Sequence, residues 1–364
     1  MGAQVPLVMA LDDPRAVLAV VGGKGSSLAR LARAGFRVPP GFHVTTSTYL
    51  DFADRGGLRE PVLAAMSAVD VSDAATFDAA AERIAELFAG QPLPAPTAAA
   101  IARAYSSLGD DVPVAVRSSA TVEDLPGMSA AGQHDTYLNV RGEAAVLDAV
   151  KRCWVSLWSA RAIGYRARRG VEPGEVSIAV VVQRLVPAEA AGVMFTVDPV
   201  DDAHDKVVVS ANWGLGESVV AGEATPDVAI IDRASGTVVS YQVGSKEMMT
   251  VADATATRAA GTPAGLRSAA VLSPGQVGEL ARVGLAIEKL YGEPVDVEWA
   301  LAAGELFIVQ ARPVTPAADR TAAGPGEQWN DSLDGDYLWG NGNVGEALPD
   351  VMTPATWSFV ELLM

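Results

Sequence analysis

The chain has 364 residues, 49% of them hydrophobic, which is enough for two or three packed subdomains. Its formal net charge of -17 repels polyanions, so nucleic acid is not an expected partner and any anion site must be local. The single cysteine, Cys153, excludes a disulfide framework and fits a reducing, cytoplasmic compartment. The N-terminus lacks the basic region of a signal peptide, and no apolar run reaches the roughly 18 residues of a membrane span.

The first part of the chain alternates helical and strand patterns. Residues 22–35, GGKGSSLARLARAG, predict a glycine turn that opens a short helix and puts Lys24 at its N-terminus. Residues 75–107 predict two helices interrupted by QPLPAP, and VPVAVR (112–117) predicts a strand that ends at Arg117 and leads into a loop. One long amphipathic helix is expected over 143–168, with Trp154 and Trp158 on its apolar face.

The second part is rich in strands. Apolar runs predict strands at 177–186, 191–199, 206–213, 227–232 and 237–243. Ser273-Pro274 predicts the start of a helix that runs to about Leu290. A hairpin of strands 293–301 and 305–313 follows, and the Ala-, Pro- and Gly-rich composition of 316–328 predicts a linker. Residues 329–364 are too short to fold alone and are expected to open a further domain.

The predicted hairpin carries polar residues on one face of each strand. Asp296 and Glu298 alternate with apolar residues, as do Gln310 and Arg312. A three-residue loop with Gly304 in the left-handed region would set Glu298 opposite Gln310 and Asp296 across from Arg312. A carboxylate and an amide oxygen suit Mg²⁺, and Arg312 would neutralise phosphate oxygens. The same pattern also fits a half-buried hairpin with a solvated polar face.

Two glycine-rich segments could bind phosphate. The turn at Lys24 combines backbone N–H groups, a helix N-terminus and an ammonium group, although it also fits a plain helix start. Arg117 follows an otherwise apolar strand, where a guanidinium needs an anion, and the loop from Ser118 to Gly132 and Thr136 could close over a triphosphate. That loop also fits a simple surface connection.

Other polar residues give weaker signals. Gln183, at the end of a very apolar strand, could read an adenine edge. The turn NWGLGES (212–218) fits a structural and a functional role equally. The histidines are His43, His134 and His204, and they lack metal-ligand spacing and the small-residue run that precedes a phosphoryl-carrying histidine.

Five motifs together resemble a known family: GGKGSSLARLARAGFRVPPGFHVTT, VAVRSSATVEDLPGMSAAGQHDTYLNV, VVVQRLVPAEAAGVMFTVDP, NWGLGESVVAGEATPD and VDVEWALAAGELFIVQARPVT. They resemble the ATP-binding half of the phosphoenolpyruvate synthase, pyruvate phosphate dikinase and rifampicin phosphotransferase superfamily. The tail DYLWGNGNVGEALPDVMTPATWSF is similar to the start of the substrate-binding domain in rifampicin phosphotransferase-like enzymes.

The resemblance implies an α+β ATP-grasp fold of two or three subdomains, with ATP in the cleft between them. The expected subdomains are 1–110, 111–200 with the phosphate loop and 201–315 with the metal-binding hairpin. The positions that match the family's ATP contacts are Lys24, Arg117, Gly132, Thr136 and Gln183, and those that gather metal and phosphates are Glu298, Gln310 and Arg312. Lys24, Arg117 and Arg312 are the expected catalytic cations, and Glu298 and Gln310 the expected Mg²⁺ ligands.

The family reaction converts ATP to AMP and phosphate and passes the β-phosphoryl group through a histidine on a swivelling domain to an acceptor. The sequence carries no such domain, so the chain is expected to bind ATP and Mg²⁺ and to need a histidine domain in cis or in trans. The expected acceptor is a small molecule such as rifampicin. The alternatives are a phosphoenolpyruvate synthase-like enzyme acting on pyruvate, and a stand-alone nucleotide-binding subunit without transfer activity.

Overall fold

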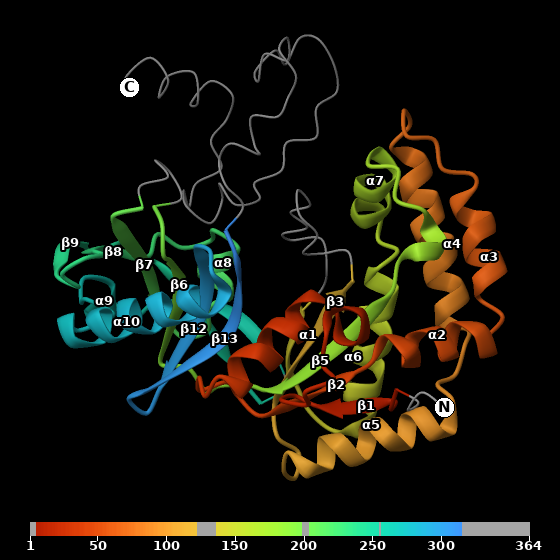
Figure 1. Cartoon of the computed structure of the whole chain (residues 1–364), viewed down its shortest axis with the longest axis horizontal. Coiled ribbons are helices and arrows are strands. Elements are labelled where there is room, and N and C mark those ends of the chain that lie inside the picture. Colours follow the sequence, from red (N-terminus) through yellow and green to blue (C-terminus); the bar gives the residue numbers. More distant parts are fainter. Residues whose placement is uncertain (1–4, 122–135, 199–203, 255, 315–364) are drawn as a thin grey trace. The chain divides into compact units, whose positions relative to one another are not determined.

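The computed structural model describes residues 5–121, 136–198, 204–254 and 256–314 of the chain. The described residues divide into two compact units (Figure 1): unit 1 takes those up to residue 186 and those in 252–257 and 307–312, and unit 2 takes those in 187–251, 258–306 and 313–314. Both units contain helices and sheet strands, which confirms the mixed α+β class. Among the described helices, none combines the length and the apolar character that a bilayer crossing requires.

Unit 1 is built on a five-stranded antiparallel sheet of order β1-β2-β5-β3-β4. One row of paired residues crosses the whole sheet and consists of Met9, His43, Val181, Arg117 and Thr136. Side chains in such a row share one face of the sheet. The strands are β1 (Val8–Ala10), β2 (Gly41–Val44), β3 (Val114–Ala120), β4 (Thr136–Val140) and β5 (Ile178–Arg184).

Helices contribute to the packing on both faces of this sheet. Leu28 of α1 packs against Val181, on the face that carries Arg117. The opposite face, with Val116 and Val182, belongs to the main core, which the remaining helices complete with buried aromatic and aliphatic side chains. The helices are α1 (Leu18–Arg33), α2 (Thr46–Arg55), α3 (Arg59–Met66), α4 (Ala75–Ala89), α5 (Ala95–Ser107), α6 (Glu143–Ser156), α7 (Ala160–Arg168) and the 3-10 turn η1 (Pro173–Glu175).

The single helix predicted over 143–168 is wrong. Helix α6 ends at Ser156 and α7 begins at Ala160, because Ser159 is extended and its hydroxyl oxygen accepts the Ala162 N–H at 3.3 Å as an N-cap. The apolar face was predicted correctly, since Trp154 and Trp158 are both buried. The apolar pattern continues through the break, and the capping serine was the only local sign of it.

Unit 2 holds most of a six-stranded sheet of order β13-β12-β6-β7-β8-β9. Its strands are β6 (Ala190–Phe195), β7 (Lys206–Trp213), β8 (Asp227–Asp232), β9 (Val238–Gln242), β12 (Val295–Ala302) and β13 (Glu305–Pro313), of which residues 307–312 group with unit 1. The helices are α8 (Glu217–Val220), α9 (Ala264–Arg267) and α10 (Pro274–Tyr291). Helix α10 starts as predicted, with a capping box between Ser273 and Gln276.

The hairpin loop between β12 and β13 differs from the prediction. It has two residues, Ala303 and Gly304, with φ values of 51° and 74°, rather than three. The loop argument for setting Glu298 opposite Gln310 therefore fails, and the roles of the two residues stay predictions from family resemblance. Of the four polar residues, Asp296 is only 6% exposed, which departs from a solvated face. Glu298, Gln310 and Arg312 are half-buried, as the alternative of a half-buried hairpin predicts.

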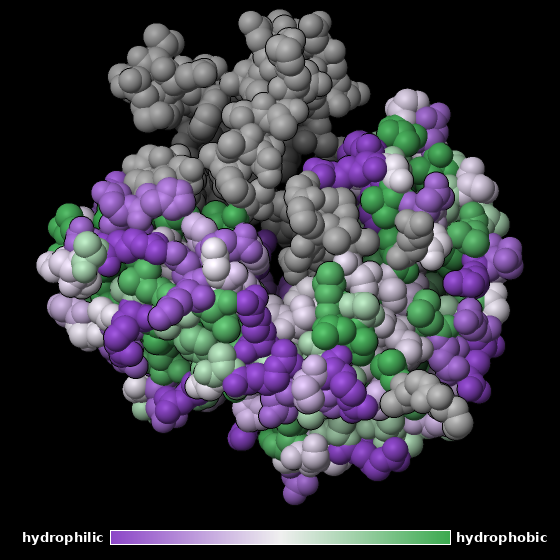
Figure 2. Space-filling model, viewed as in Figure 1, coloured by the Kyte–Doolittle hydropathy of each residue, from purple (hydrophilic) through white to green (hydrophobic). Residues whose placement is uncertain are grey.

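Several short strands were missed by the sequence analysis. A two-stranded sheet forms from β10 (Met248–Ala252) and β11 (Thr257–Gly261), neither of which has a clear alternation of apolar and polar residues. Figure 2 shows hydrophilic residues spread over the visible faces of both units, with the apolar residues in separate groups between them.

Candidate functional site

The glycine turn that carries Lys24 is a break inside α1. Gly22 has a φ of 70° and a ψ of -179°, so the helix is interrupted there and resumes at Gly23. Lys24 consequently lies in the first turn of the resumed helix, which confirms the predicted helix N-terminus. The first N–H groups of a helix have no carbonyl partner within it and attract anions.

Ser119 of β3 is hydrogen-bonded to this break. Its hydroxyl donates to the Val21 carbonyl at 2.7 Å and accepts the Gly25 N–H at 3.0 Å. The prediction that the strand ends at Arg117 is wrong, because β3 continues to Ala120 and places Ser118 and Ser119 in the sheet. The sequence analysis assigned Ser119 to a loop and missed this role; its position two residues after Arg117, on the same strand face, was the available signal.

Arg117 and Thr136 are brought together by the sheet. They are direct partners in the register of β3 and β4, and Thr136 is the exposed first residue of its strand rather than part of a loop. Arg117 is half-buried in the middle of β3. Its side chain and that of Ser119 point to the face on which α1 packs, so the guanidinium and the break in α1 belong to one face of one sheet.

The segment 307–312 of β13 lies against the same elements within unit 1. The Arg117 guanidinium donates to the Val309 carbonyl at 3.0 Å, and the Ser27 hydroxyl donates to the Ala311 carbonyl. Gln310 and Arg312, both half-buried, flank Ala311. The structure thus brings the Lys24 turn, Arg117 and the backbone that carries Gln310 and Arg312 to one region.

Gln183 lies on the same sheet face, opposite Ala115 and Gly41. It is only 2% exposed, and its amide nitrogen donates to the Pro39 carbonyl at 3.1 Å. One amide donor is therefore engaged in holding the chain before β2, and reading of an adenine edge by Gln183 stays a prediction. Gly132 and His134, from the predicted phosphate loop, lie outside the described residues.

The histidine of the sheet is held neutral. His43 is fully buried, and its Nε2 lies 3.1 Å from the Leu11 carbonyl oxygen. Burial lowers the pKa of His43 from 6.5 to about 4, although the contact with Leu11 opposes the shift. This residue is therefore a neutral core imidazole near the Lys24 turn.

The residues predicted to hold Mg²⁺ are Glu298 of β12 and Gln310 of β13. Glu298 is the one half-buried residue of β12, in unit 2. The described part of the chain contains no cluster of three or more His, Cys, Asp or Glu side chains that could hold a metal alone. Nucleotide-bound Mg²⁺ needs only one or two protein oxygens, since phosphates and water complete its shell. The carboxylate of Glu298 and the amide oxygen of Gln310 fit that requirement.

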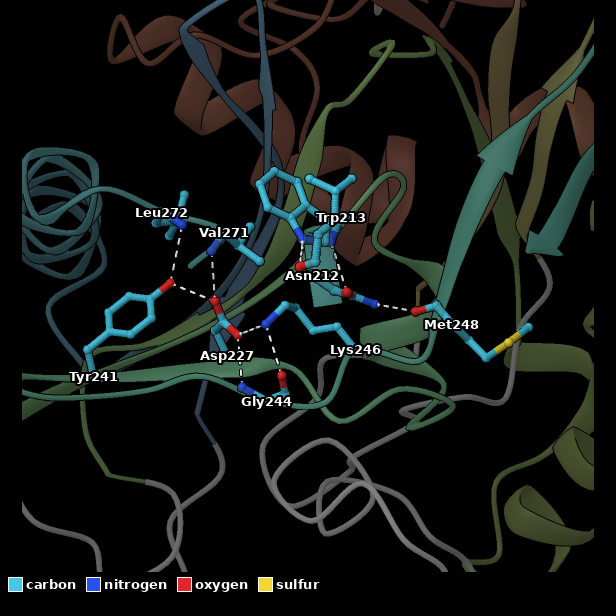
Figure 3. Close-up of polar contacts among 10 residues, drawn as sticks. Asn212, Trp213, Asp227, Tyr241, Gly244, Lys246, Met248, Val271 and Leu272 are labelled. Carbon is cyan, nitrogen blue, oxygen red and sulfur yellow. Dashed lines mark hydrogen bonds and ion pairs between the residues drawn. The ribbon is translucent and has the colours of Figure 1, made fainter. Parts of the chain in front are cut away.

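The turn NWGLGES is tied into a polar network of unit 2 (Figure 3). The Asn212 amide donates to the Ser218 hydroxyl at 3.0 Å and to the Met248 carbonyl at 2.9 Å. Asp227, which is 1% exposed, accepts from Lys246, from the Tyr241 hydroxyl and from backbone N–H groups. The Asn212 bonds give the turn a structural role. The sequence offered no signal for the buried ion pair of Asp227 and Lys246.

The region contains a helix N-terminus with a lysine, an arginine on the facing strand and a strand segment with a further arginine, which are groups that suit phosphate. The comparison with family models shows to which class of proteins the chain belongs. Residues 18–330 match the model of the pyruvate phosphate dikinase, AMP/ATP-binding domain, and the chain belongs to this family. The resemblance drawn from the motifs is thereby confirmed.

Similar proteins carry two kinds of name. A probable phosphoenolpyruvate synthase of Methanothermobacter thermautotrophicus is 42% identical over 83% of this chain and 45% of its own length. Another, of Methanocaldococcus jannaschii, is 43% identical over 81% of the chain and 25% of its length. A rifampicin phosphotransferase of a Streptomyces species is 40% identical over 85% of the chain and 36% of its length. The chain thus spans less than half the length of these relatives.

Proposed function

We propose that the chain is the ATP-grasp module of a phosphotransferase that converts ATP to AMP and phosphate. In this proposal the β-phosphoryl group passes to a histidine on a further domain, in the same protein or in a partner, and then to a small-molecule acceptor. The γ-phosphoryl group is taken up by water and leaves as phosphate. The supporting observation is that Arg117 and Ser27 both bond to the segment 309–311 in the unit that also holds Lys24.

The residues of the chain would act by positioning and by neutralising charge. Lys24, Arg117 and Arg312 would bind phosphate oxygens, while Thr136 and the loop with Gly132 would cover them. Glu298 and Gln310 would hold Mg²⁺, which supplies further charge neutralisation between phosphate oxygens when bound. The predicted subdomains 1–110, 111–200 and 201–315, the linker 316–328 and the start of an acceptor domain at 329–364 belong to the same proposal.

The acceptor is the least constrained part of the proposal. Rifampicin fits the name of the Streptomyces relative, and pyruvate fits the phosphoenolpyruvate synthases, at nearly the same identity. The resemblance of the tail 329–364 to rifampicin phosphotransferase-like enzymes favours rifampicin. A nucleotide-binding subunit without transfer activity is the second candidate, because the family model that matches residues 18–330 is that of an AMP/ATP-binding domain.

The transfer proposal is tested by mixing the chain with a separately produced phosphohistidine domain of this family and ATP labelled at the β-phosphate. We expect AMP and a labelled histidine. Arg312→Ala should lower the rate at least about tenfold, because a charge-assisted contact to phosphate is lost. The control is Arg103→Ala, which removes an exposed arginine of α5.

The results distinguish the two candidate functions and also test the role of Arg312. Tight ATP binding without a labelled histidine would favour the subunit that only binds nucleotide. Absence of ATP binding in calorimetry would contradict both candidates. An equal loss of rate in the Arg312 and Arg103 variants would remove the specific role of Arg312 while leaving the transfer reaction in place.

A further inference from the structure

The Ser119 hydroxyl occupies the place of a helical hydrogen bond. In an uninterrupted α-helix the Gly25 N–H would donate to the Val21 carbonyl, four residues before it. Here the hydroxyl lies between these two groups, accepting from Gly25 at 3.0 Å and donating to Val21 at 2.7 Å. Ser119 is fully buried, so the insertion is built into the core of unit 1.

The backbone of Gly22 is shaped to admit this insertion. Its φ of 70° is accessible to glycine at little cost, and a Cβ at this position would lie 2.0 Å from the Ser119 carbonyl oxygen. The break in α1 thus depends on two residues from distant parts of the sequence. A side chain inserted into the ladder of backbone hydrogen bonds is a known cause of a helix kink.

The inserted Ser119 hydroxyl connects the elements that carry Lys24 and Arg117, two cations of the proposed phosphate site. Ser119 follows Arg117 by two residues, so both side chains point to the same face of β3. On the helix side, the break sets Lys24 in the first turn of the resumed segment. The Ser119 hydroxyl is thus a direct link between the strand that carries Arg117 and the helix segment that carries Lys24, in addition to the packing of Leu28 against Val181.

We propose that Ser119 is a positioning residue of the nucleotide site: it keeps α1 open at Gly22 and so directs Lys24 and the first N–H groups of the resumed helix at the phosphates. This proposal rests on the proposed function. Without the hydroxyl, the Gly25 N–H can bond to Val21 directly, which closes the helix and turns the first-turn groups away. Ser119 itself need not touch the nucleotide.

The test is Ser119→Ala in the 364-residue chain, with MgATP and adenosine titrated separately by calorimetry. We expect the affinity for MgATP to fall about tenfold, the effect of misplacing one charge-assisted hydrogen bond. The affinity for adenosine, which has no phosphate, should stay the same. A general loss of structure would lower both affinities, so the comparison isolates the phosphate turn.

Two further variants keep the test decisive. Ser119→Cys retains the shape with a weaker donor and should give an intermediate loss; it replaces the alanine variant if that one does not fold. Ser156→Ala removes another buried serine hydroxyl of unit 1, which donates to the Cys153 carbonyl at 2.8 Å, and should leave MgATP affinity unchanged.

Each outcome has one meaning. Unchanged MgATP affinity in the Ser119 variants, or an equal fall for adenosine, overturns the positioning role while the proposed function stands. A wild-type chain that does not bind MgATP overturns the proposed function and the positioning role with it.

Discussion

His43 shows how one buried side chain couples the fold to pH. Nε2 must carry the proton, because the Leu11 carbonyl can only accept, and this leaves Nδ1 as an acceptor without a partner in the described structure. Nδ1 lies against Gly25, where an added Cβ would be 3.2 Å away. A second proton on the ring would therefore be a buried, unpaired donor, with Asp13 as the one charged group that favours it.

We expect this histidine to destabilise the protein in acid. Its pKa is 6.5 when unfolded and about 4 when folded, so only the unfolded chain gains a proton as the pH falls between these values. The free energy of unfolding should fall by about 1.4 kcal/mol for each pH unit within that range, or about 3 kcal/mol in total. Below the range His43 should cause no further change. Above pH 6.5 the residue contributes no pH dependence.

Urea denaturation of the wild type and of His43→Gln at about pH 7 and about pH 4.5 measures this contribution. The glutamine amide can still donate to Leu11 and does not titrate. The difference between the two proteins should therefore shrink or reverse in acid. A wild type and a variant with the same pH dependence would show that the pKa of His43 is the same in the folded and the unfolded chain.

At the level of elements, the loop before β10 is fastened by a buried ion pair (Figure 3). Lys246 and Asp227 are 0% and 1% exposed, and the Lys246 ammonium also donates to the Gly244 carbonyl at 3.0 Å. Burial raises the pKa of Tyr241 to about 12, so its hydroxyl stays protonated and donates to Asp227. The Asp227 carboxylate thus accepts hydrogen bonds from Tyr241 of β9, from Gly244 and Lys246 in the loop after β9, and from the Val271 N–H.

Removing one partner of this pair should be costly. Lys246→Met leaves the Asp227 carboxylate buried without its cation, for an expected loss of about 3–5 kcal/mol in the free energy of unfolding. The double variant with Asp227→Asn should lose less than the sum of the two single changes, because no unpaired charge remains.

Lys206→Met is the matched control in unit 2. Lys206 is 34% exposed and lies 3.9 Å from Asp198, so its loss should cost at most about 1 kcal/mol. Chemical denaturation of the wild type and of the four variants, Asp227→Asn alone included, measures these differences. Equal costs for Lys246→Met and Lys206→Met would mean that the buried pair contributes no more than a surface pair.

The elements that sequence analysis predicted well are those with strong local patterns. The capping box at Ser273 and the apolar run of β5 marked their elements within one or two residues. The errors arose where distant contacts decide. Strand β3 extends beyond its apolar run because Ser119 bonds to α1, and the short strands β10 and β11 have no periodic signal of their own.

In the candidate site too, features set by local sequence patterns could be predicted and features set by distant contacts could not. Lys24 could be placed at a helix N-terminus because glycine and helix patterns are local. The pairing of Arg117 with Thr136 and the contact of Arg117 with Val309 depend on sheet order, which the sequence does not reveal. Only the family resemblance pointed to their convergence in advance.

At the scale of the whole molecule, the net charge of -17 and a local group of cations act over different distances. Charges are screened beyond about 10 Å at moderate salt, so a small triphosphate beside Lys24 and Arg117 experiences mainly those cations. A long polyanion extends over surface where acidic residues dominate. The same protein should therefore bind MgATP and reject nucleic acid.

We expect a fluorescently labelled single-stranded DNA to show no saturable anisotropy change with this chain, while a labelled ATP analogue does under the same conditions. Cation-driven DNA binding weakens steeply with salt, so a measurement at low salt gives it the best chance to appear. DNA binding that disappears as salt is raised would reveal a continuous basic surface. Because 44 acidic residues face only 27 lysines and arginines, such a surface would require strong segregation of charge.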